Sequence, residues 1–281
     1  MKAMLALALT ILSLNTFSAT SIYKSGSSKF VTNEQFLKEI PANARVILGE
    51  YHYNHLIQGA QAQIIKDVVK ATYSENSFTV GWEFLNYTAQ SEIDHNFEMF
   101  SDDKIDLAKF FQGLSVSKNN LVYAPILKAV KDLGGQLLGL NIERSVKKKL
   151  ITGGIKAVDP KYVPADFQLG DKNYRKRFNT VMGSHVPREK LDGYFLAQCF
   201  TDSVMSQALI TNSTFDLQFV VAGSFHTDYF SGTVAQLKRD KSLPVITIKL
   251  IDTIGMGKKE IGELTNPSKE FGPIADYIFL L

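Results

Sequence analysis

The sequence lacks the short motifs that assign many proteins to a class. It has no GxxxxGK[ST] phosphate loop, no GxGxxG dinucleotide fingerprint, no GxSxG nucleophile elbow and no HExxH zinc helix. It also has only one cysteine, Cys199, so no disulfide can form within the chain and the fold must depend on its core. Cys199 lies in a predicted helix, where we expect a small buried residue rather than a nucleophile.

Charge does not point to a nucleic-acid partner. The chain has 31 lysines and arginines against 28 acidic residues, a net charge of +3, and this mild excess is not the basic balance of a nucleic-acid-binding protein. Basic clusters at residues 144–149 and 172–177 are interpreted as solvated faces, which could also help to hold an acidic ligand.

The first residues have the features of a secretory signal peptide. Lys2 precedes an apolar run over residues 4–14, and small residues follow up to Ala19. This run is too short for a membrane span, which needs roughly 20 apolar residues. We therefore expect a signal peptide that is cleaved near residues 18–20. One domain over residues 20–281 would then be exported to the periplasm or secreted. No cysteine follows the leader to carry a lipid, and no later segment predicts a transmembrane span.

Four short apolar runs predict strands. Near-continuous runs of β-branched and aliphatic residues are typical of strands that are covered on both faces. The runs are RVILGE (residues 45–50), SFTVGWE (77–83), QLLGLN (136–141) and QFVVAG (218–223).

Helical patterns separate these runs. Behind Asn54, a candidate N-cap, Leu56, Ala60, Ile64 and Val68 recur at every fourth position and predict an amphipathic helix. The alternation of strands and helices predicts an α/β fold with three layers, α/β/α, around a mainly parallel central sheet. Further helices are expected over residues 87–100, 121–133, 193–210 and 227–239, and a further strand over 244–250.

Two segments depart from this alternation. Residues 151–190 carry scattered glycines and prolines among charges, which predicts an irregular insertion over the sheet and a candidate lid. The chain ends in the apolar residues YIFLL (277–281), which we interpret as an edge strand.

Polar side chains follow the predicted strands at the point where each strand ends. Open α/β sheets bind ligands at the carboxyl ends of their strands, so we expect these side chains to form one site. Carboxylates and imidazoles bind transition metals and transfer protons near neutral pH. The residues are Glu50 and His52 after the first strand, Glu83 after the second, Asn141, Glu143 and Arg144 after the third, and His226 after the fourth.

Ordinary structural roles compete with this interpretation. Taken alone, the carboxylate of Glu83 could cap the next helix by accepting hydrogen bonds from the first backbone N–H groups of that helix. His55, His95 and His185 have no evident partners and are expected to be surface or internally satisfied residues.

Six segments in order resemble the ChaN-like haem-binding family, which is grouped with Tiki, TraB and erythromycin esterase-like proteins. They are VILGEYHYN, WEFLNYTAQ, YAPILKAV, LGLNIER, AQCFTDSVMSQAL and VVAGSFH, and the resemblance spans roughly residues 42–240. It implies an exported protein with a three-layer α/β/α core that holds haem between subunits. The matching positions are Glu50, His52, Asn54, Glu83, Gln90, Tyr123, Asn141, Arg144, Gln198, Asp202 and His226.

The resemblance also implies an iron ligand. A tyrosine ligates the iron in this family with histidine involvement, which makes Tyr123 the first choice here and Tyr87 the second. Phenolate suits ferric haem, and lysines and arginines suit its propionates. Two departures bear on this reading: the lipid-anchoring cysteine that is frequent in the family is absent, and Thr201 precedes Asp202 where the family commonly has arginine.

Three functions remain open at this point. The first is an exported haem-binding protein of haem or iron uptake or storage, a possible homodimer with outer-membrane uptake machinery as a partner. The second is a hydrolase of the Tiki or esterase kind, in which Glu50, His52, Glu83 and His226 bind a divalent metal or activate water directly. The third is a scaffold that retains these residues only as a hydrogen-bond network.

Overall fold

The computed structural model describes residues 20–281, so the predicted signal peptide and its cleavage site lie outside the described residues. These residues form one eight-stranded sheet in the order β2-β1-β8-β7-β3-β6-β4-β5. From β8 to β5 neighbouring strands are parallel, whereas β1 pairs antiparallel with both β8 and β2. The strands are β1 (Ser21–Lys24), β2 (Lys29–Val31), β3 (Arg45–Glu50), β4 (Phe78–Asn86), β5 (Gln136–Asn141), β6 (Leu217–Gly223), β7 (Val245–Ile251) and β8 (Tyr277–Leu280).

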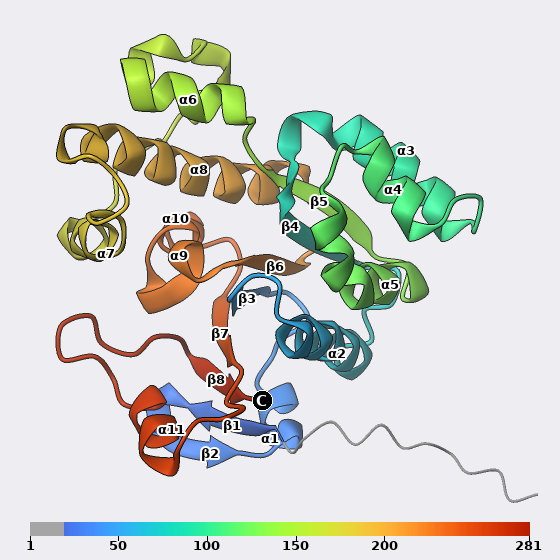
Figure 1. Cartoon of the computed structure of the whole chain (residues 1–281). Helices are drawn as coiled ribbons and strands as arrows, with labels where there is room; N and C mark the ends of the chain where they lie inside the picture. The colour runs from blue at the N-terminus through green and yellow to red at the C-terminus, as the bar shows by residue number, and fades with distance from the viewer. Residues whose placement is uncertain (1–19) are drawn as a thin grey trace, which may run out of the picture.

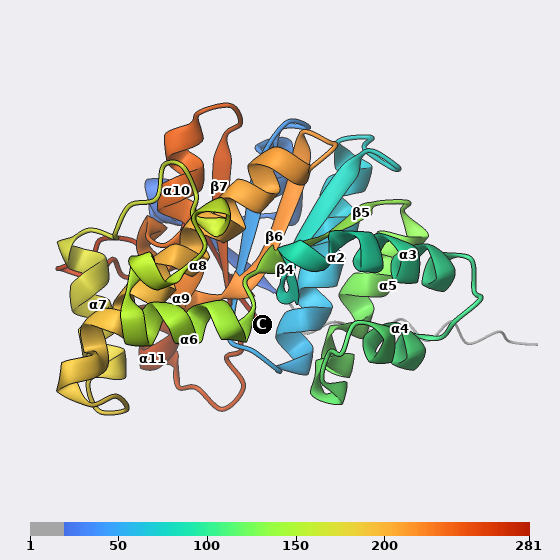
Figure 2. The same ribbon diagram turned by 90° about the horizontal axis from the view of Figure 1, so that it is seen from above.

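Helices cover both faces of this sheet, with α2 to α5 on one side and α8 to α10 on the other (Figures 1 and 2). The α-helices are α1 (Asn33–Lys38), α2 (His55–Ala71), α3 (Gln90–Ser101), α4 (Leu107–Gly113), α5 (Ala124–Asp132), α6 (Arg144–Gly153), α7 (Lys172–Met182), α8 (Leu191–Asn212), α9 (Ser224–Thr227), α10 (Thr233–Asp240) and α11 (Lys258–Leu264). Short 3-10 helices are η1 (Ser25–Ser27), η2 (Tyr87–Ala89), η3 (Lys118–Tyr123), η4 (Ile155–Ala157), η5 (Pro160–Tyr162), η6 (Arg188–Lys190) and η7 (Asp228–Phe230).

The alternation of side chains along β3 shows why two helical layers form. Val46 and Leu48 belong to the core that includes Ile65 of α2, whereas Ile47 belongs to the core that includes Met205 of α8. Successive side chains of a strand point to opposite faces, and each fully buried aliphatic side chain contributes about 1.5–3 kcal/mol. A strand that is apolar at every position therefore needs cover on both faces, and the predicted three-layer α/β/α fold is confirmed.

Two predicted helices begin or break differently from expectation. The helix expected over 227–239 is divided into α9, η7 and α10, because Tyr229 and Phe230 have φ values of 59° and 56°, outside the helical region. The helix expected over 121–133 becomes α-helical only at Ala124. Pro125 lies in its first turn, where the missing N–H costs no helical hydrogen bond.

Two further expectations need correction. The apolar tail forms β8, but β8 lies between β7 and β1 and is not an edge strand. The segment 151–190 is less irregular than expected, since it contains α7, which Asp171 caps by accepting the N–H of Tyr174. This helix packs against α8 through Phe178 and Phe195, whose ring centroids are 5.3 Å apart. No helix within residues 20–281 combines the length and the apolar content that crossing a membrane requires.

Candidate functional site

Two glutamates and two histidines meet at the carboxyl edge of the parallel strands. Glu50 ends β3 and His52 lies two residues beyond it, while Glu83 lies in β4 and His226 in α9, directly after β6. Because β3, β6 and β4 are neighbours in the sheet, these residues are close in space. The structure thus brings together four of the seven side chains that the predicted strand ends indicated.

The local course of β4 helps to place Glu83. The register between β4 and β5 shifts between Trp82 and Asn86, and such an irregularity bends a strand and redirects its side chains. Glu83 Oε2 accepts a 2.6 Å hydrogen bond from the backbone N–H of Gly223. A Cβ atom at residue 223 would lie only 2.6 Å from His52 Nε2, so the approach of this imidazole requires glycine.

Glu50 is a buried carboxylate with three side-chain partners. Its side chain is 1% exposed; the Tyr123 hydroxyl donates to Oε1, and His52 Nδ1 lies 2.8 Å from the same oxygen. Gln58 Nε2 donates to Oε2 at 2.8 Å. Burial lowers the pKa of His52, but the hydrogen bond to Glu50 and the charge of Glu83 raise it overall. These contacts compensate a buried charge that would otherwise be strongly unfavourable.

Tyr123, the first choice for an iron ligand, has no exposed surface. Its ring packs against Trp82 and Phe84, with centroids 5.0 and 5.3 Å away. Burial and then the charge of Glu50 raise the pKa of its phenol, so the side chain is neutral. Complete burial disfavours Tyr123 as an iron ligand, because ligation needs an accessible phenolate oxygen. Its observed role is to hold the carboxylate of Glu50.

The imidazole of His226 lies between two acidic side chains. Its Nε2 is 3.4 Å from Glu83 Oε1, and its Nδ1 is 2.6 Å from Asp202 Oδ1. Burial lowers the pKa of His226, but the charges of Glu83 and Asp202 raise it to about 10. Burial in turn raises the pKa of Glu83, but His226 lowers it to about 2. At neutral pH the central group is therefore an imidazolium.

Helix α8 supplies two of the predicted residues from one face. Gln198 and Asp202 are one turn apart, as the spacing indicated, and Gln198 Nε2 lies 3.1 Å from His226 Nδ1. Tyr174 of α7 donates to Asp202 Oδ2 at 2.7 Å, and Thr233 of α10 donates to Oδ1 at 3.0 Å. Three helices are thus joined through a single carboxylate. We call the connected side chains the buried network: Glu50, His52, Gln58, Glu83, Tyr123, Tyr174, Gln198, Asp202, His226 and Thr233.

Three other predicted residues form side-chain hydrogen bonds to backbone groups. Asn54 caps α2 by accepting the N–H of Leu56 at 3.0 Å, which confirms it as the N-cap. Asn141 Nδ2 donates to the backbone oxygen of Glu83 at 2.8 Å, and Gln90 Nε2 donates to a carbonyl of β5 at 2.9 Å. These side chains position the strand ends. As expected, Cys199 is buried, and the remaining histidines His55, His95 and His185 are exposed.

A second buried charge at the same edge was not predicted from the sequence. Lys249 of β7 is 1% exposed, and its Nζ lies 2.9 Å from Asp228 Oδ2 and donates to Ser224 Oγ. Ser224 in turn donates to the backbone oxygen of Glu50 at 2.7 Å. A lysine inside the apolar strand VITIKLI was the available signal, because a fully buried lysine requires a partner. The other missed residues, Gln58, Tyr174 and Thr233, gave no comparable signal.

A groove of about 1290 Å³ opens beside the buried network. Tyr53 and Phe84 lie at its end near His52, with ring centroids 5.7 Å apart. Tyr53 is 47% exposed and has a φ of 63°, a strained value for a residue with a side chain. The apolar lining includes Leu85, Ile93, Phe111, Leu114, Val116, Leu121 and Ile142, and the basic lining is Lys109, Lys118, Arg144 and Lys147.

Tyr53 and Tyr87 differ from Tyr123, and from each other, in their access to this groove. Burial and then the charge of Glu50 raise the pKa of Tyr53, while the charge of Arg144 opposes this shift. Tyr87, the second choice for an iron ligand, is half-buried and lines a separate cavity of about 180 Å³ with Tyr162. Of Tyr53, Tyr87 and Tyr123, Tyr53 is the one that lines the groove and is exposed.

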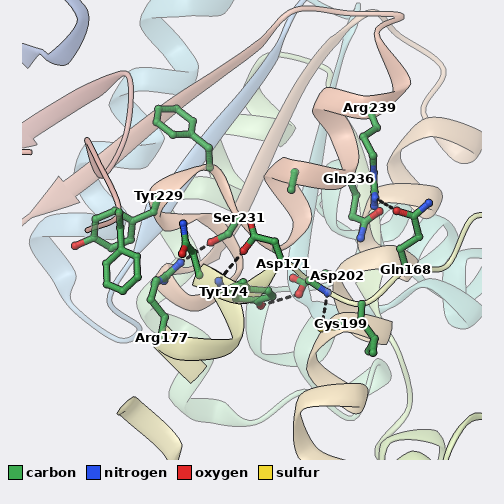
Figure 3. Close-up of a pocket in the computed structure, with 17 residues that line it drawn as sticks. Gln168, Asp171, Tyr174, Arg177, Cys199, Asp202, Tyr229, Ser231, Gln236 and Arg239 are labelled. Carbon is green, nitrogen blue, oxygen red and sulfur yellow. Dashed lines mark hydrogen bonds between the residues drawn. The ribbon is translucent and has the colours of Figure 1, made fainter. Parts of the chain in front are cut away.

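A second cavity, of about 380 Å³, lies at the Asp202 end of the buried network (Figure 3). Asp202 and Tyr174 line it, and Arg177 stands at one side, with its guanidinium 4.8 Å from the ring centroid of Tyr229. Arg177 also donates to the backbone oxygen of Asp228 at 2.7 Å. The arginine therefore joins α7 to the turn that interrupts the helix expected over 227–239.

The described residues contain no group of three or more His, Cys, Asp or Glu side chains arranged to hold a metal ion. The buried network explains this in part, because both ring nitrogens of His226 already face carboxylates. Neither nitrogen has a free lone pair while the ring is an imidazolium.

Residues 36–237 match the family described as haem-binding uptake, Tiki superfamily, ChaN. The chain belongs to this ChaN family. A solved ChaN of Campylobacter jejuni, described with cofacial haem binding, is similar in fold: it is 20% identical, the match covers 92% of this chain and 96% of that one, and the TM-score is 0.71.

Two further solved structures match at lower TM-scores. An erythromycin esterase mutant in its open conformation is 12% identical over 82% of this chain and 77% of its own, with a TM-score of 0.45. The type III effector HopBA1 is 11% identical over 85% and 87%, with a TM-score of 0.40. No curated protein matches the sequence. Membership of the ChaN family thus rests on the match over residues 36–237.

Proposed function

We propose that this ChaN-family protein binds haem in the groove beside the buried network, as an exported protein of haem or iron uptake or storage. The groove carries the proposal, because it combines an apolar lining, an exposed tyrosine and cations that have no ion-pair partner among residues 20–281. Its volume of about 1290 Å³ exceeds the roughly 300–1,000 Å³ of most small-ligand pockets. A groove of this size is suited to a large flat ligand.

The lining residues fit the three chemical parts of haem. Ile93, Phe111 and Leu114 offer apolar contacts for the macrocycle. Arg144 and Lys147 offer positive charge for the propionates. Tyr53 would hold ferric iron through its phenolate oxygen, since it is the exposed tyrosine of the groove. Haem iron would supply redox and ligand-binding chemistry, while the protein supplies the ligand, the apolar walls and the charge.

Exposed apolar side chains near the groove support a homodimer. Tyr51 and Tyr53 on either side of His52 are 59% and 47% exposed, and Leu121 at the groove is 42% exposed. Exposed apolar groups that gather at one site indicate an interaction surface. A second copy would cover these side chains and exclude water from the groove. We propose that haem is held with the help of this second copy.

A titration of the purified protein with ferric haem, followed by absorbance, tests the proposal. The wild type should bind saturably with the spectrum of a tyrosinate-ligated ferric haem. Tyr53→Phe should lose that spectrum, and the affinity should fall roughly tenfold or more, a free-energy loss of about 1.4 kcal/mol or above. Tyr51→Phe is the matched control, because it removes a phenol that is also exposed and lies on the other side of His52.

Two outcomes of this titration would contradict the proposal in different ways. Absence of saturable haem binding by the wild type would exclude the proposed function. An unchanged spectrum in Tyr53→Phe, with normal binding, would exclude Tyr53 as the ligand and leave haem binding itself intact.

One feature favours a second function, hydrolysis without a bound metal. The imidazole of His52 is fixed by Glu50, its Nε2 lies 3.9 Å from Glu83 Oε2, and its side chain is still 36% exposed. A positioned and accessible imidazole can take a proton from water during attack on an ester. Aryl ester hydrolysis that is abolished in His52→Gln would support this function, whereas equal rates in the variant and the wild type would exclude it.

A further inference from the structure

Arg177 of α7 is held in a fixed position at one side of the second cavity (Figure 3). Its Nη1 donates to the backbone oxygen of Asp228 at 2.7 Å and to Ser231 Oγ at 2.5 Å. Its guanidinium also lies over the rings of Tyr229 and Phe225, 4.8 and 5.3 Å from their centroids. Stacking and hydrogen bonds together leave this planar group little freedom to rotate. Binding of a ligand to Arg177 therefore costs little conformational entropy.

One edge of this guanidinium has no partner in the described part of the chain. Arginine carries five N–H donors, and the two acceptors named above account for the two donors of Nη1. Within residues 20–281, Nε and Nη2 of Arg177 make no hydrogen bond, and no acidic side chain forms an ion pair with this residue. The edge formed by Nε and Nη2 is a fork that matches the two oxygens of a carboxylate.

Positive charge is in excess around Arg177. Asp228 is buried, and its Oδ2 lies 2.9 Å from Nζ of the buried Lys249. Burial raises the pKa of Asp228, while the charges of Lys249 and then Arg177 oppose this shift. One carboxylate thus faces two cations, and Lys249 is its ion-pair partner. An anionic ligand at Arg177 would balance the remaining positive charge.

The two acidic side chains that line the cavity do not neutralise Arg177. Asp202 pairs with the imidazole of His226, where its Oδ1 lies 2.6 Å from Nδ1. Asp171 accepts the backbone N–H of Tyr174 at 2.8 Å as the N-cap of α7. Because both carboxylates serve other partners, we expect the negative charge that meets Arg177 to come from a ligand.

Aromatic rings line the cavity next to Arg177. The ring of Tyr229, on which the guanidinium stacks, has its centroid 5.4 Å from that of Phe271, and both residues line the cavity. Polar side chains line the opposite side, where Arg239 donates to Gln168 Oε1 (Figure 3). The volume of about 380 Å³ lies within the roughly 300–1,000 Å³ of most small-ligand pockets. One small molecule can therefore meet a carboxylate-binding edge, aromatic surface and polar groups together.

We propose that this cavity, called the Arg177 cavity below, is a second binding site that takes a small aromatic carboxylate. The carboxylate accepts hydrogen bonds from Nε and Nη2 of Arg177, and the ring packs against Tyr229 and Phe271. A polar substituent at the far end of the ring faces the side of the cavity at Gln168. The Arg177 cavity shares no lining residue with the groove beside the buried network, so this site does not depend on the proposed haem binding.

Isothermal titration calorimetry of the purified protein tests the Arg177 cavity with three probes. 4-Hydroxybenzoate has the carboxylate and the ring, 4-hydroxybenzamide has the same shape without the charge, and acetate has the carboxylate without the ring. The wild type should bind 4-hydroxybenzoate saturably, and roughly tenfold or more tightly than either other probe, because each lacks one of the two contacts. Equal affinity for 4-hydroxybenzoate and 4-hydroxybenzamide would overturn the proposal, as would the absence of saturable 4-hydroxybenzoate binding.

Arg177→Lys keeps the positive charge but removes the fork. The affinity for 4-hydroxybenzoate should fall roughly tenfold, and that for 4-hydroxybenzamide should change little. Arg175→Lys is the matched control on the same helix. Its guanidinium also stacks on a ring, 4.7 Å from the centroid of Phe195, but it pairs with Asp192 and does not line the Arg177 cavity. This control should leave the affinities for both probes unchanged, and thermal unfolding shows whether each variant is folded.

Phe271→Ala is a second test that removes none of the hydrogen-bond partners of Arg177. It removes part of the aromatic wall, so 4-hydroxybenzoate should bind roughly threefold or more weakly while remaining preferred over 4-hydroxybenzamide. This variant decides the location of the site if Arg177→Lys does not fold. Unchanged affinity for 4-hydroxybenzoate in Phe271→Ala, or in a folded Arg177→Lys, would overturn the assignment to the Arg177 cavity. The haem titration is a separate measurement, so failure of either proposal leaves the other standing.

Discussion

The buried network and the groove proposed to bind haem, called the haem groove below, lie side by side at one edge of the sheet, yet they satisfy their polar groups differently. In the buried network, Glu50 and His226 are 1% and 7% exposed and face partners of the protein itself. In the groove, Tyr53 is exposed, and Arg144 and Lys147 have no ion-pair partner among residues 20–281. Polar groups that have partners within the protein stabilise the fold. Polar groups that line a cavity without protein partners indicate a ligand-binding site.

The segment GEYHYN contributes to both regions. Glu50 and His52 point into the buried network, while Tyr53, the next residue along the chain, adopts a positive φ and lines the groove. Substitutions should therefore divide into two groups. Those in the buried network should lower the free energy of unfolding, and those in the groove should lower the affinity for haem.

The largest effect is expected from Asp202→Asn. The substitution keeps the shape of the side chain but removes one of the two acidic partners of the buried His226 imidazolium. Breaking a buried ion pair in this way costs about 3–5 kcal/mol, to be measured as the free energy of unfolding in urea. Asp192→Asn is the control, because that carboxylate on the same helix is 90% exposed and surface pairs contribute only about 0–1 kcal/mol.

An equal loss of stability in the Asp202 and Asp192 variants would contradict the comparison. It would mean that burial of the Asp202 contact adds nothing to its strength. A loss confined to Asp202→Asn, with haem affinity retained, would separate the role of the buried network from that of the groove.

Much of the layout could be predicted from the sequence because it depends on local patterns. The apolar runs that became β3, β4, β5 and β6 are parallel neighbours, and parallel strands bring their carboxyl ends to one edge. The convergence of Glu50, Glu83 and His226 follows from that topology alone. The N-cap role of Asn54 is local as well, since it needs only the first turn of α2.

The access of each tyrosine could not be predicted in the same way. Tyr123 and Tyr53 both belong to the matching segments, but η3 packs one against Trp82 while a positive φ turns the other outward. Such differences depend on packing between elements that are distant in sequence. The same holds for Lys249 and Asp228, which pair across β7 and the turn after α9, where no spacing rule applies.

The next effect concerns pH, and it tests whether the central imidazolium stabilises the fold. His226 has a pKa of about 10 against an ordinary value of 6.5, so its contribution is fully present below pH 6.5 and is lost as the pH rises towards 10. Glu83 has a pKa of about 2 against 4.5, so its contribution is present above pH 4.5 and is lost as the pH falls towards 2. The contribution of this pair should be greatest between pH 4.5 and 6.5.

Urea unfolding between pH 5 and 10 measures this dependence. His226→Gln should flatten the decline of stability above pH 6.5, because the side chain that loses its proton is gone. His95→Gln, which changes an exposed histidine, should leave the decline in place. A decline of the same slope in His226→Gln would show that other groups cause it.

The smallest expected effect is that of Tyr123→Phe, and it separates the two regions most directly. The variant removes one donor from Glu50, which keeps His52 and Gln58 as partners, so the free energy of unfolding should fall by about 1–3 kcal/mol. The ferric haem spectrum should be unchanged, because Tyr123 is completely buried. Tyr53→Phe should behave in the opposite way, with unfolding within about 0.5 kcal/mol of the wild type and an altered spectrum. A spectrum lost in Tyr123→Phe but kept in Tyr53→Phe would place the iron ligand inside the buried network and show that the two regions act as one.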